Sequence, residues 1–94
     1  MIIGFKSEET KRIYDGLTSR RYPAGIQVAA LRKLFMLQSA ITINDLRTPP
    51  GNRLEKLSGS REGQYSIRIN DQWRICFVWT EGNNADDVEI VDYH

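Results

Sequence analysis

Cysteine is nearly absent from this sequence, because Cys76 is the only one among 94 residues. An internal disulfide is therefore excluded, and a reducing, cytoplasmic setting is expected. Cys76 lies in an apolar run. That position favours a packed strand residue over a nucleophile, since a free cysteine behaves mostly as a small buried hydrophobe.

Histidine and long apolar runs are equally scarce. His94 is the only histidine, so no cluster of zinc or two-metal ligands can be assembled, and we expect neither a metal nor another cofactor. No apolar stretch approaches the roughly 18 residues of a membrane span, and the N-terminus lacks a signal-peptide pattern. We expect one domain over residues 1–94, without a membrane segment.

The charges are divided along the chain, although the net charge is only +1. Residues 1–74 contain all 13 basic and seven acidic residues, a net charge of +6, whereas the last 20 residues contain five acidic residues and no basic one. Such a division suits a protein that meets a nucleic acid with one surface. A solvated charged face is the simpler alternative.

The first half of the chain predicts helices. Residues 1–6 are expected to form a short strand, and Ser7 is expected to cap a helix from Glu8 to Leu17. A 3.6-residue apolar period predicts a second helix from Ile26 to Ser39. One more helical turn is expected at Thr42–Leu46, before the Pro49–Pro50 pair.

The second half predicts strands at four places that are rich in β-branched and aromatic residues, namely Arg53–Leu57, Gln64–Ile69, Trp73–Thr80 and Val88–Tyr93. The fold class is therefore α+β, with an N-terminal strand and a helical hairpin packed on one face of a twisted antiparallel sheet. Four strand aromatics fall on the apolar face and are expected in the core: Tyr65, Trp73, Phe77 and Trp79.

The hairpin between the second and third of these strands has a preferred register. A three-residue loop at 70–72 pairs Ile67 with Ile75 and keeps the apolar side chains on one face, with Asn70 or Asp71 in the left-handed conformation. Arg68 and Arg74 then lie opposite each other on the open face. Two like charges so placed favour an anion between them, or else two solvated side chains that splay apart.

The last strand completes the open face. If Val88 and Ile90 point to the core, Tyr93 shares the face of Arg74, whereas Asp92 and His94 start on the other side. Tyr93 is then placed to stack on a base or donate to a phosphate.

Four segments together resemble the HigB toxins of the RelE-like superfamily: Asn52–Leu57, Arg61–Ile67, Asp71–Phe77 and Val88–His94. The resemblance implies a RelE-like fold and the killer protein of a type II toxin–antitoxin module. It also implies cleavage of mRNA in the ribosomal A site, and neutralisation by a HigA-like antitoxin with a helix-turn-helix domain. Operator DNA would then be bound only through the antitoxin complex.

The sequence departs from the HigB pattern at residues 58–60. Ser58 stands at the position of a lysine that contributes to RNA cleavage in well-studied relatives. Ser60 stands in place of an aspartate, and Glu55 stands where some relatives have a histidine. A substitute cation would have to come from Lys56 or Arg61.

Metal-free RNA cleavage needs a positioned 2′-hydroxyl, a base, an acid and a stabiliser of the phosphorane charge. Arg74 is the candidate stabiliser, and Arg61, Arg68 and Lys56 are candidates to bind neighbouring phosphates. His94 titrates near neutral pH, and with Asp92 and Tyr93 it forms the candidate catalytic C-terminus. The alternative is a non-catalytic inhibitor that binds RNA or the ribosome.

Overall fold

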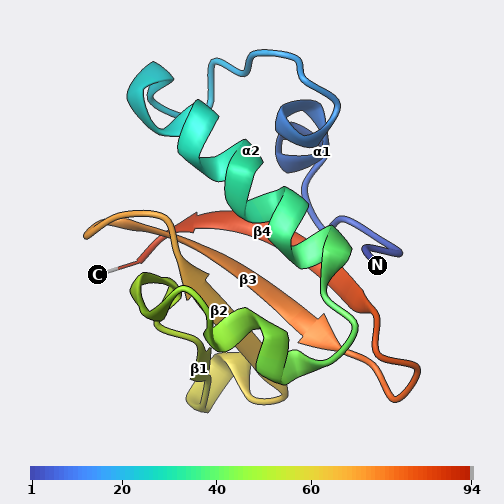
Figure 1. The fold of residues 1–94 in the computed structure, drawn as a ribbon. Coiled ribbons are helices and arrows are strands. Elements are labelled where there is room, and N and C mark those ends of the chain that lie inside the picture. The colour runs from blue at the N-terminus through green and yellow to red at the C-terminus, as the bar shows by residue number, and fades with distance from the viewer. Residues whose placement is uncertain (94) are drawn as a thin grey trace.

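The computed structural model describes residues 1–93. Two helices, α1 (Glu8–Tyr14) and α2 (Ala24–Ser39), lie on one side of an antiparallel sheet with strand order β1-β2-β3-β4 (Figure 1). The four strands are β1 (Glu55–Lys56), β2 (Gln64–Arg68), β3 (Trp73–Trp79) and β4 (Ala85–Asp92). The predicted α+β class is confirmed. Within the described range no helix is long and apolar enough to cross a membrane.

Helix α1 begins as predicted but ends earlier. The Ser7 side chain accepts a hydrogen bond from the Thr10 amide at 3.2 Å, which caps the first turn. The helix ends at Tyr14 rather than Leu17 because Gly16 takes a left-handed conformation with φ of 82°. Glycine enters that region without the steric cost that other residues incur, so it ends helices readily.

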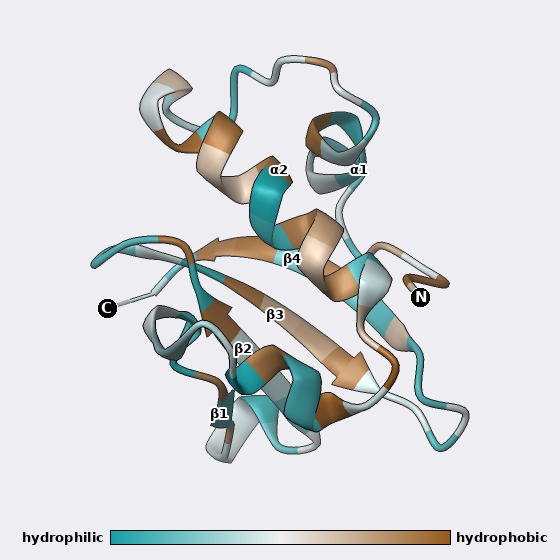
Figure 2. Ribbon diagram, viewed as in Figure 1, coloured by the Kyte–Doolittle hydropathy of each residue, from teal (hydrophilic) through white to brown (hydrophobic). Residues whose placement is uncertain are grey.

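Helix α2 supplies the helical half of the core. Its buried residues Ile26, Ala30, Leu34 and Leu37 recur with the predicted helical period. They pack against the apolar side of the sheet, where β3 is hydrophobic along most of its length (Figure 2). Of the four predicted core aromatics, Phe77 is fully buried, and the other three are partly buried and pack against the core.

The hairpin of β2 and β3 has the predicted register, because Ile67 pairs with Ile75 and Arg68 with Arg74. The conformation of its loop differs from the prediction, since neither Asn70 nor Asp71 has a positive φ. The Asn70 side chain instead accepts hydrogen bonds from the Gln72 and Trp73 amides at 2.9 and 2.8 Å. Asparagine thus shapes this turn by side-chain hydrogen bonding rather than by left-handed backbone.

Strand β4 starts at Ala85, three residues before the predicted Val88. Ala85 and Val88 are both fully buried, a spacing of three that a regular strand cannot place on one face. A bulge resolves the conflict, because the register against β3 shifts between Cys76 and Val78 and Asp87 has a φ of 50°. Because of this bulge, the start of β4 does not follow the alternation of apolar and polar residues by which strands are predicted.

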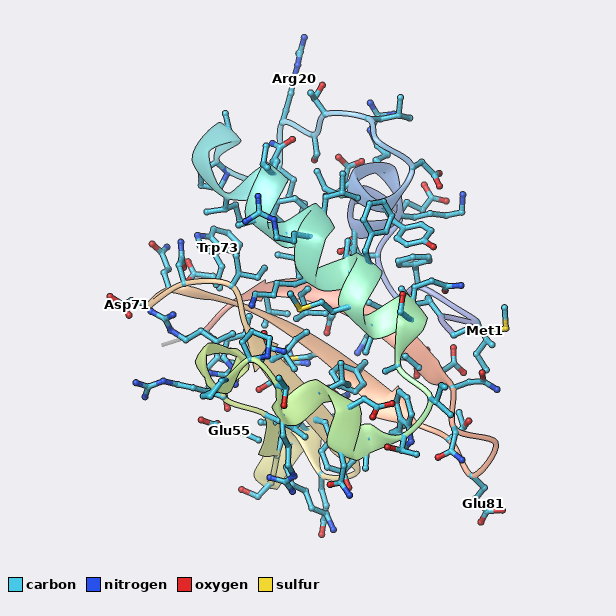
Figure 3. All side chains as sticks on the ribbon, viewed as in Figure 1. Met1, Arg20, Glu55, Asp71, Trp73 and Glu81 are labelled. Atoms are coloured by element: carbon cyan, nitrogen blue, oxygen red, sulfur yellow. The ribbon has the colours of Figure 1, made fainter. Side chains whose placement is uncertain are left out.

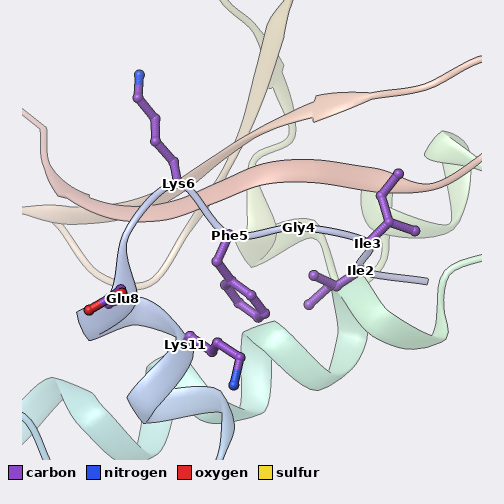
Figure 4. A pocket seen from close by; sticks show the side chains of 7 residues that line it. All are labelled: Ile2, Ile3, Gly4, Phe5, Lys6, Glu8 and Lys11. Atoms are coloured by element: carbon purple, nitrogen blue, oxygen red, sulfur yellow. The ribbon is translucent and has the colours of Figure 1, made fainter.

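The N-terminal segment is not the predicted strand. It forms two isolated parallel bridges with β4, between Ile2 and Ala85 and between Phe5 and Val88. Phe5 points toward the helices and Lys6 points to the other side of β4 (Figure 4). Regular pairing is interrupted where the bulge in β4 separates the two bridges. The segment nevertheless covers the edge of β4 and sends one lysine to the far face of the sheet.

The predicted strand at Arg53–Leu57 shrinks to the two residues of β1. Its first residue, Arg53, is left-handed with φ of 44° and follows a short 3₁₀ turn at Pro50–Asn52. Backbone in that conformation cannot continue a strand. Two further 3₁₀ turns lie at Ile43–Arg47, close to the predicted Thr42–Leu46 turn, and at Gly59–Arg61.

Candidate active site on the arginine face

The side of the sheet away from the helices carries the predicted site residues. Successive strand residues point to opposite sides, so the core positions of Ile67 and Ile75 place their neighbours Arg68 and Arg74 on this second side. We call it the arginine face, and its sheet residues include Ser66, Arg68, Arg74, Cys76 and Glu89.

Arg74 is buried on this face, with only 8% of its surface exposed, rather than lying on an open surface. Its Nε donates to Ser66 Oγ at 2.8 Å, and its Nη2 donates to the Arg53 carbonyl oxygen at 2.6 Å. Nη1 lies 3.8 Å from a Glu55 carboxylate oxygen, which is longer than a hydrogen bond. Neutral acceptors therefore fix the guanidinium while its charge is only weakly compensated.

Arg68 and Arg74 lie opposite each other in the ladder, as predicted, but their side chains turn to different partners. The Arg68 guanidinium pairs with Asp71, which lies at the exposed tip of the β2–β3 loop (Figure 3). Arg74 turns toward Ser66 and the Arg53 carbonyl. Each arginine thus has its own hydrogen-bond partners within the protein.

Tyr93 lies on the arginine face, as strand parity predicted. The Arg74 guanidinium carbon is 5.8 Å from the centre of the Tyr93 ring, a cation–π geometry. The Tyr93 amide donates to the Gln72 carbonyl oxygen at 2.7 Å, which ties this residue to the β2–β3 loop. The ring is 36% exposed, so it covers Arg74 on one side and presents its other side to solvent.

Asp92 starts on the opposite side, also as predicted. It pairs with Trp73 in the ladder, and its carboxylate accepts a hydrogen bond from Gln72 Nε2 at 3.0 Å. The Gln72 backbone and side chain thus hold two consecutive residues of the C-terminus. His94 was predicted to be catalytic and lies outside the described residues.

Arg61 also reaches the arginine face, but a carboxylate holds it. Its Nη1 donates to Glu89 at 2.9 Å and to Gln64 at 3.1 Å, and Lys6 Nζ lies 3.9 Å from the same Glu89 oxygen. The hydrogen bond with Glu89 raises the pKa of Arg61. Glu89 thereby offsets cationic charge at this end of the face.

The two predicted substitutes for the missing lysine differ in position. Lys56 pairs with Tyr65 in the ladder between β1 and β2, so the register places it in the row of the core-facing residues. Arg61, at the end of the 3₁₀ turn that contains Ser60, contacts the arginine face directly. Ser58 itself is exposed before that turn.

Sequence reasoning missed three residues that build the site. Ser66 and the Arg53 carbonyl orient Arg74, and Glu89 compensates Arg61. The predicted register could have indicated Ser66, because it places this small polar residue on the strand next to Arg74 and on the same face. No sequence pattern marks a backbone carbonyl such as that of Arg53.

Cys76 belongs to the arginine face, where it pairs with Ser66 of β2 and Glu89 of β4, and is completely buried. Burial raises the pKa of its thiol, although Arg61 and Arg74 act in the opposite direction. The interpretation as a packed strand residue is confirmed. Within residues 1–93 no group of three His, Cys, Asp or Glu side chains could hold a metal ion.

The fold is that of the RelE-like proteins. It matches a chain of the YoeB–YefM complex from Staphylococcus aureus with a TM-score of 0.61 and 21% identity, over 100% of this chain and 98% of that chain. The family model for the RelE-like toxin of the type II toxin–antitoxin system HigB matches residues 3–94. The chain therefore belongs to the HigB-like toxin family, as the sequence resemblance predicted.

Individual relatives agree with that assignment. Toxin HigB-1 of Vibrio cholerae is 42% identical over 83 residues, covering 87% of each chain. Endoribonuclease HigB of Proteus vulgaris is 30% identical over 94 residues, covering 100% of both chains. The name of the second relative agrees with the predicted enzyme class, and membership in a type II system gives the protein an antitoxin as its partner.

Proposed function

We propose that this HigB-like toxin is an endoribonuclease that cleaves mRNA bound in the ribosomal A site and so stops translation. The observation that carries the proposal is the state of Arg74. Its guanidinium is fixed by hydrogen bonds to neutral acceptors, beside an exposed tyrosine ring, on the face that the helices leave uncovered. A cation in this state is suited to a negatively charged transition state.

The reaction uses the RNA's own 2′-hydroxyl as nucleophile. Its oxygen attacks the adjacent phosphorus, the bond to the 5′-oxygen breaks, and the products are a 2′,3′-cyclic phosphate and a free 5′-hydroxyl. Arg74 stabilises the extra charge of the phosphorane, because its Nη1 lies 3.8 Å from the Glu55 carboxylate, beyond hydrogen-bonding distance, and carries N–H donors that a phosphate oxygen can accept from.

The C-terminal residues supply the remaining functions in this proposal. Tyr93 stacks on a base or donates to the phosphate from its position over Arg74. His94, as imidazolium, gives a proton to the leaving 5′-oxygen, because imidazole is the side chain that changes charge near neutral pH, and the proton of the 2′-hydroxyl passes to solvent. Asp92, fixed through Gln72, favours the protonated imidazole by its negative charge. Of the three cations predicted to bind neighbouring phosphates, Arg68 does so in this proposal, whereas Lys56 lies in the core-facing row and Arg61 is held by Glu89.

We further propose a HigA-like antitoxin with a helix-turn-helix domain as the specific partner, with operator DNA bound only through the complex. Support for an antitoxin of some kind comes from the family itself. No metal or other cofactor takes part in this reaction scheme.

One observation favours a second candidate, a non-catalytic inhibitor that occupies RNA or the ribosome. Ser58 replaces the expected lysine, and Glu89 already pairs with Arg61. Both features remove positive charge from the place where cleavage would need it. Binding would survive such losses better than catalysis, because binding is distributed over more contacts.

Primer extension on mRNA from cells that express the protein distinguishes the two candidates. Cleavage predicts codon-phased stops with the wild type that disappear with Arg74→Gln and with His94→Ala. The matched control is Lys11→Gln on α1, whose partner is Asp15 and which should leave the stops unchanged. Growth arrest without any stops, retained in both site variants, would establish the non-catalytic alternative.

A further inference from the structure

Lys33 of α2 occupies an unusual position for a surface lysine. Its ammonium donates to Asn52 Oδ1, and within the described residues it forms no ion pair with a carboxylate. An ammonium has three N–H donors and this amide uses one of them. Arg32 precedes it in the sequence, and a hydrophilic band crosses the middle of α2 (Figure 2).

Asn52 is a rigid partner, because it is completely buried. Its Nδ2 donates to the Leu46 carbonyl oxygen at 3.2 Å and to the Thr48 carbonyl oxygen at 3.4 Å. These bonds fix the amide so that its oxygen points to Lys33. The ammonium is therefore held in place by a neutral group, as the guanidinium of Arg74 is.

The two cations are linked through consecutive residues. Lys33 binds the side chain of Asn52, and Arg74 binds the carbonyl oxygen of Arg53. The left-handed backbone at Arg53, with φ of 44°, sets the direction of that carbonyl. The short 3₁₀ turn at Pro50–Asn52 and the residue after it thus provide a hydrogen-bond partner to each of the two cations.

Positive charge gathers around Lys33. Partial burial lowers the pKa of the Lys33 ammonium, and so do Arg32 and Arg68. Among residues 1–93, Arg68 has the fully exposed Asp71 as its counter-ion, and exposed pairs of this kind are weak. The cations Arg32, Lys33 and Arg68 repel one another, and no described carboxylate pairs with Lys33. A polyanion would stabilise such an arrangement.

We propose that Lys33, together with Arg68, binds a backbone phosphate of the RNA strand. The inference rests on the proposed function for the identity of the ligand, and it adds a contact from α2, outside the sheet. It also supplies a fixed cation in a chain that has Ser58 at the expected lysine position.

The test is equilibrium binding of a single-stranded oligoribonucleotide whose 2′-O-methyl sugars prevent cleavage. Fluorescence anisotropy measures the affinity at several KCl concentrations. Loss of one phosphate contact lowers the slope of log affinity against log salt by about 0.7. We expect that decrease, with weaker binding, for Lys33→Gln. Lys33→Arg should retain the wild-type slope.

Lys11→Gln is the matched control, because it removes one positive charge from α1, where Asp15 is its partner. Its slope should equal that of the wild type, and equal melting temperatures would show that the variants fold. The inference is overturned by a Lys33→Gln slope equal to that of the wild type, by an equal decrease in Lys11→Gln, or by a wild type that does not bind the RNA.

Failure of the proposed function gives a different result. A wild type that binds the oligonucleotide but produces no stops in primer extension contradicts the nuclease, while the salt slopes still decide the role of Lys33. An unchanged affinity for RNA combined with weaker binding of the antitoxin by Lys33→Gln would assign this lysine to the protein partner instead, and would overturn the inference.

Discussion

Arg74 and Arg61 lie on the same face of the sheet but are held in opposite ways. Arg74 donates to a hydroxyl and a backbone carbonyl, both neutral, whereas Arg61 donates to the carboxylate of Glu89. The first arrangement fixes the geometry of a cation and preserves its charge. The second fixes the geometry and neutralises the charge. The partners of a cation, more than its exposure, therefore decide whether it can bind a phosphate.

Replacement of each arginine by lysine should give the largest contrast between them. Arg74→Lys keeps the charge but loses the two-sided hydrogen bonding, so we expect cleavage to fall by about 10²- to 10³-fold, the typical cost of losing one charge-stabilising donor. Arg61→Lys should change the rate only a few-fold. Single-turnover cleavage of ribosome-bound mRNA measures both. Equal losses would mean that the two arginines have the same role.

Ser66→Ala tests whether a neutral acceptor positions Arg74. The change leaves a buried Nε–H without its partner, which costs about 1–3 kcal/mol. We expect a lower melting temperature and roughly tenfold slower cleavage, because about 1.4 kcal/mol corresponds to a factor of ten in rate. Ser66→Thr retains the hydroxyl and serves as the control. An Ala variant with full activity would show that the Arg53 carbonyl suffices.

Glu89→Gln should leave Arg61 held by a neutral acceptor, as Arg74 is. The amide still accepts a hydrogen bond from Arg61 but no longer neutralises it. We expect a few-fold tighter RNA binding and a salt slope that rises by about 0.7 as one more phosphate is bound. Binding of the non-cleavable oligoribonucleotide measures both. Weaker binding would instead mean that Glu89 orients Arg61 for its contact.

Cys76 should give the smallest effect, because it is a completely buried free cysteine of the arginine face. Burial raises the pKa of the thiol, so at pH 8 the thiolate is scarcer than in an ordinary free cysteine. Labelling by iodoacetamide should be much slower in the native protein than in urea, since the thiolate is the reactive form. Rapid native labelling would mean that the arginine charges outweigh burial.

The register of β2 and β3 was predictable because side-chain alternation leaves one pairing that keeps the apolar residues together. The same alternation predicted that Tyr93 would share the face of Arg74. The start of β4 was not predictable, because the bulge at Asp87 breaks the alternation. The N-terminal segment was misjudged for a related reason, since its short apolar run pairs with that same irregular strand.

Residue patterns in the sequence were enough to predict the family, the apolar period of helix α2 and the pairing of β2 with β3. Local preferences and residue patterns are enough for those features. Whether a cation is held by neutral groups or by a carboxylate depends on the tertiary structure, because the partners are distant in the chain. They are Ser66 and Arg53 for Arg74, Asn52 for Lys33, and Glu89 for Arg61. Electrostatic compensation depends on distance in space, which no local pattern records.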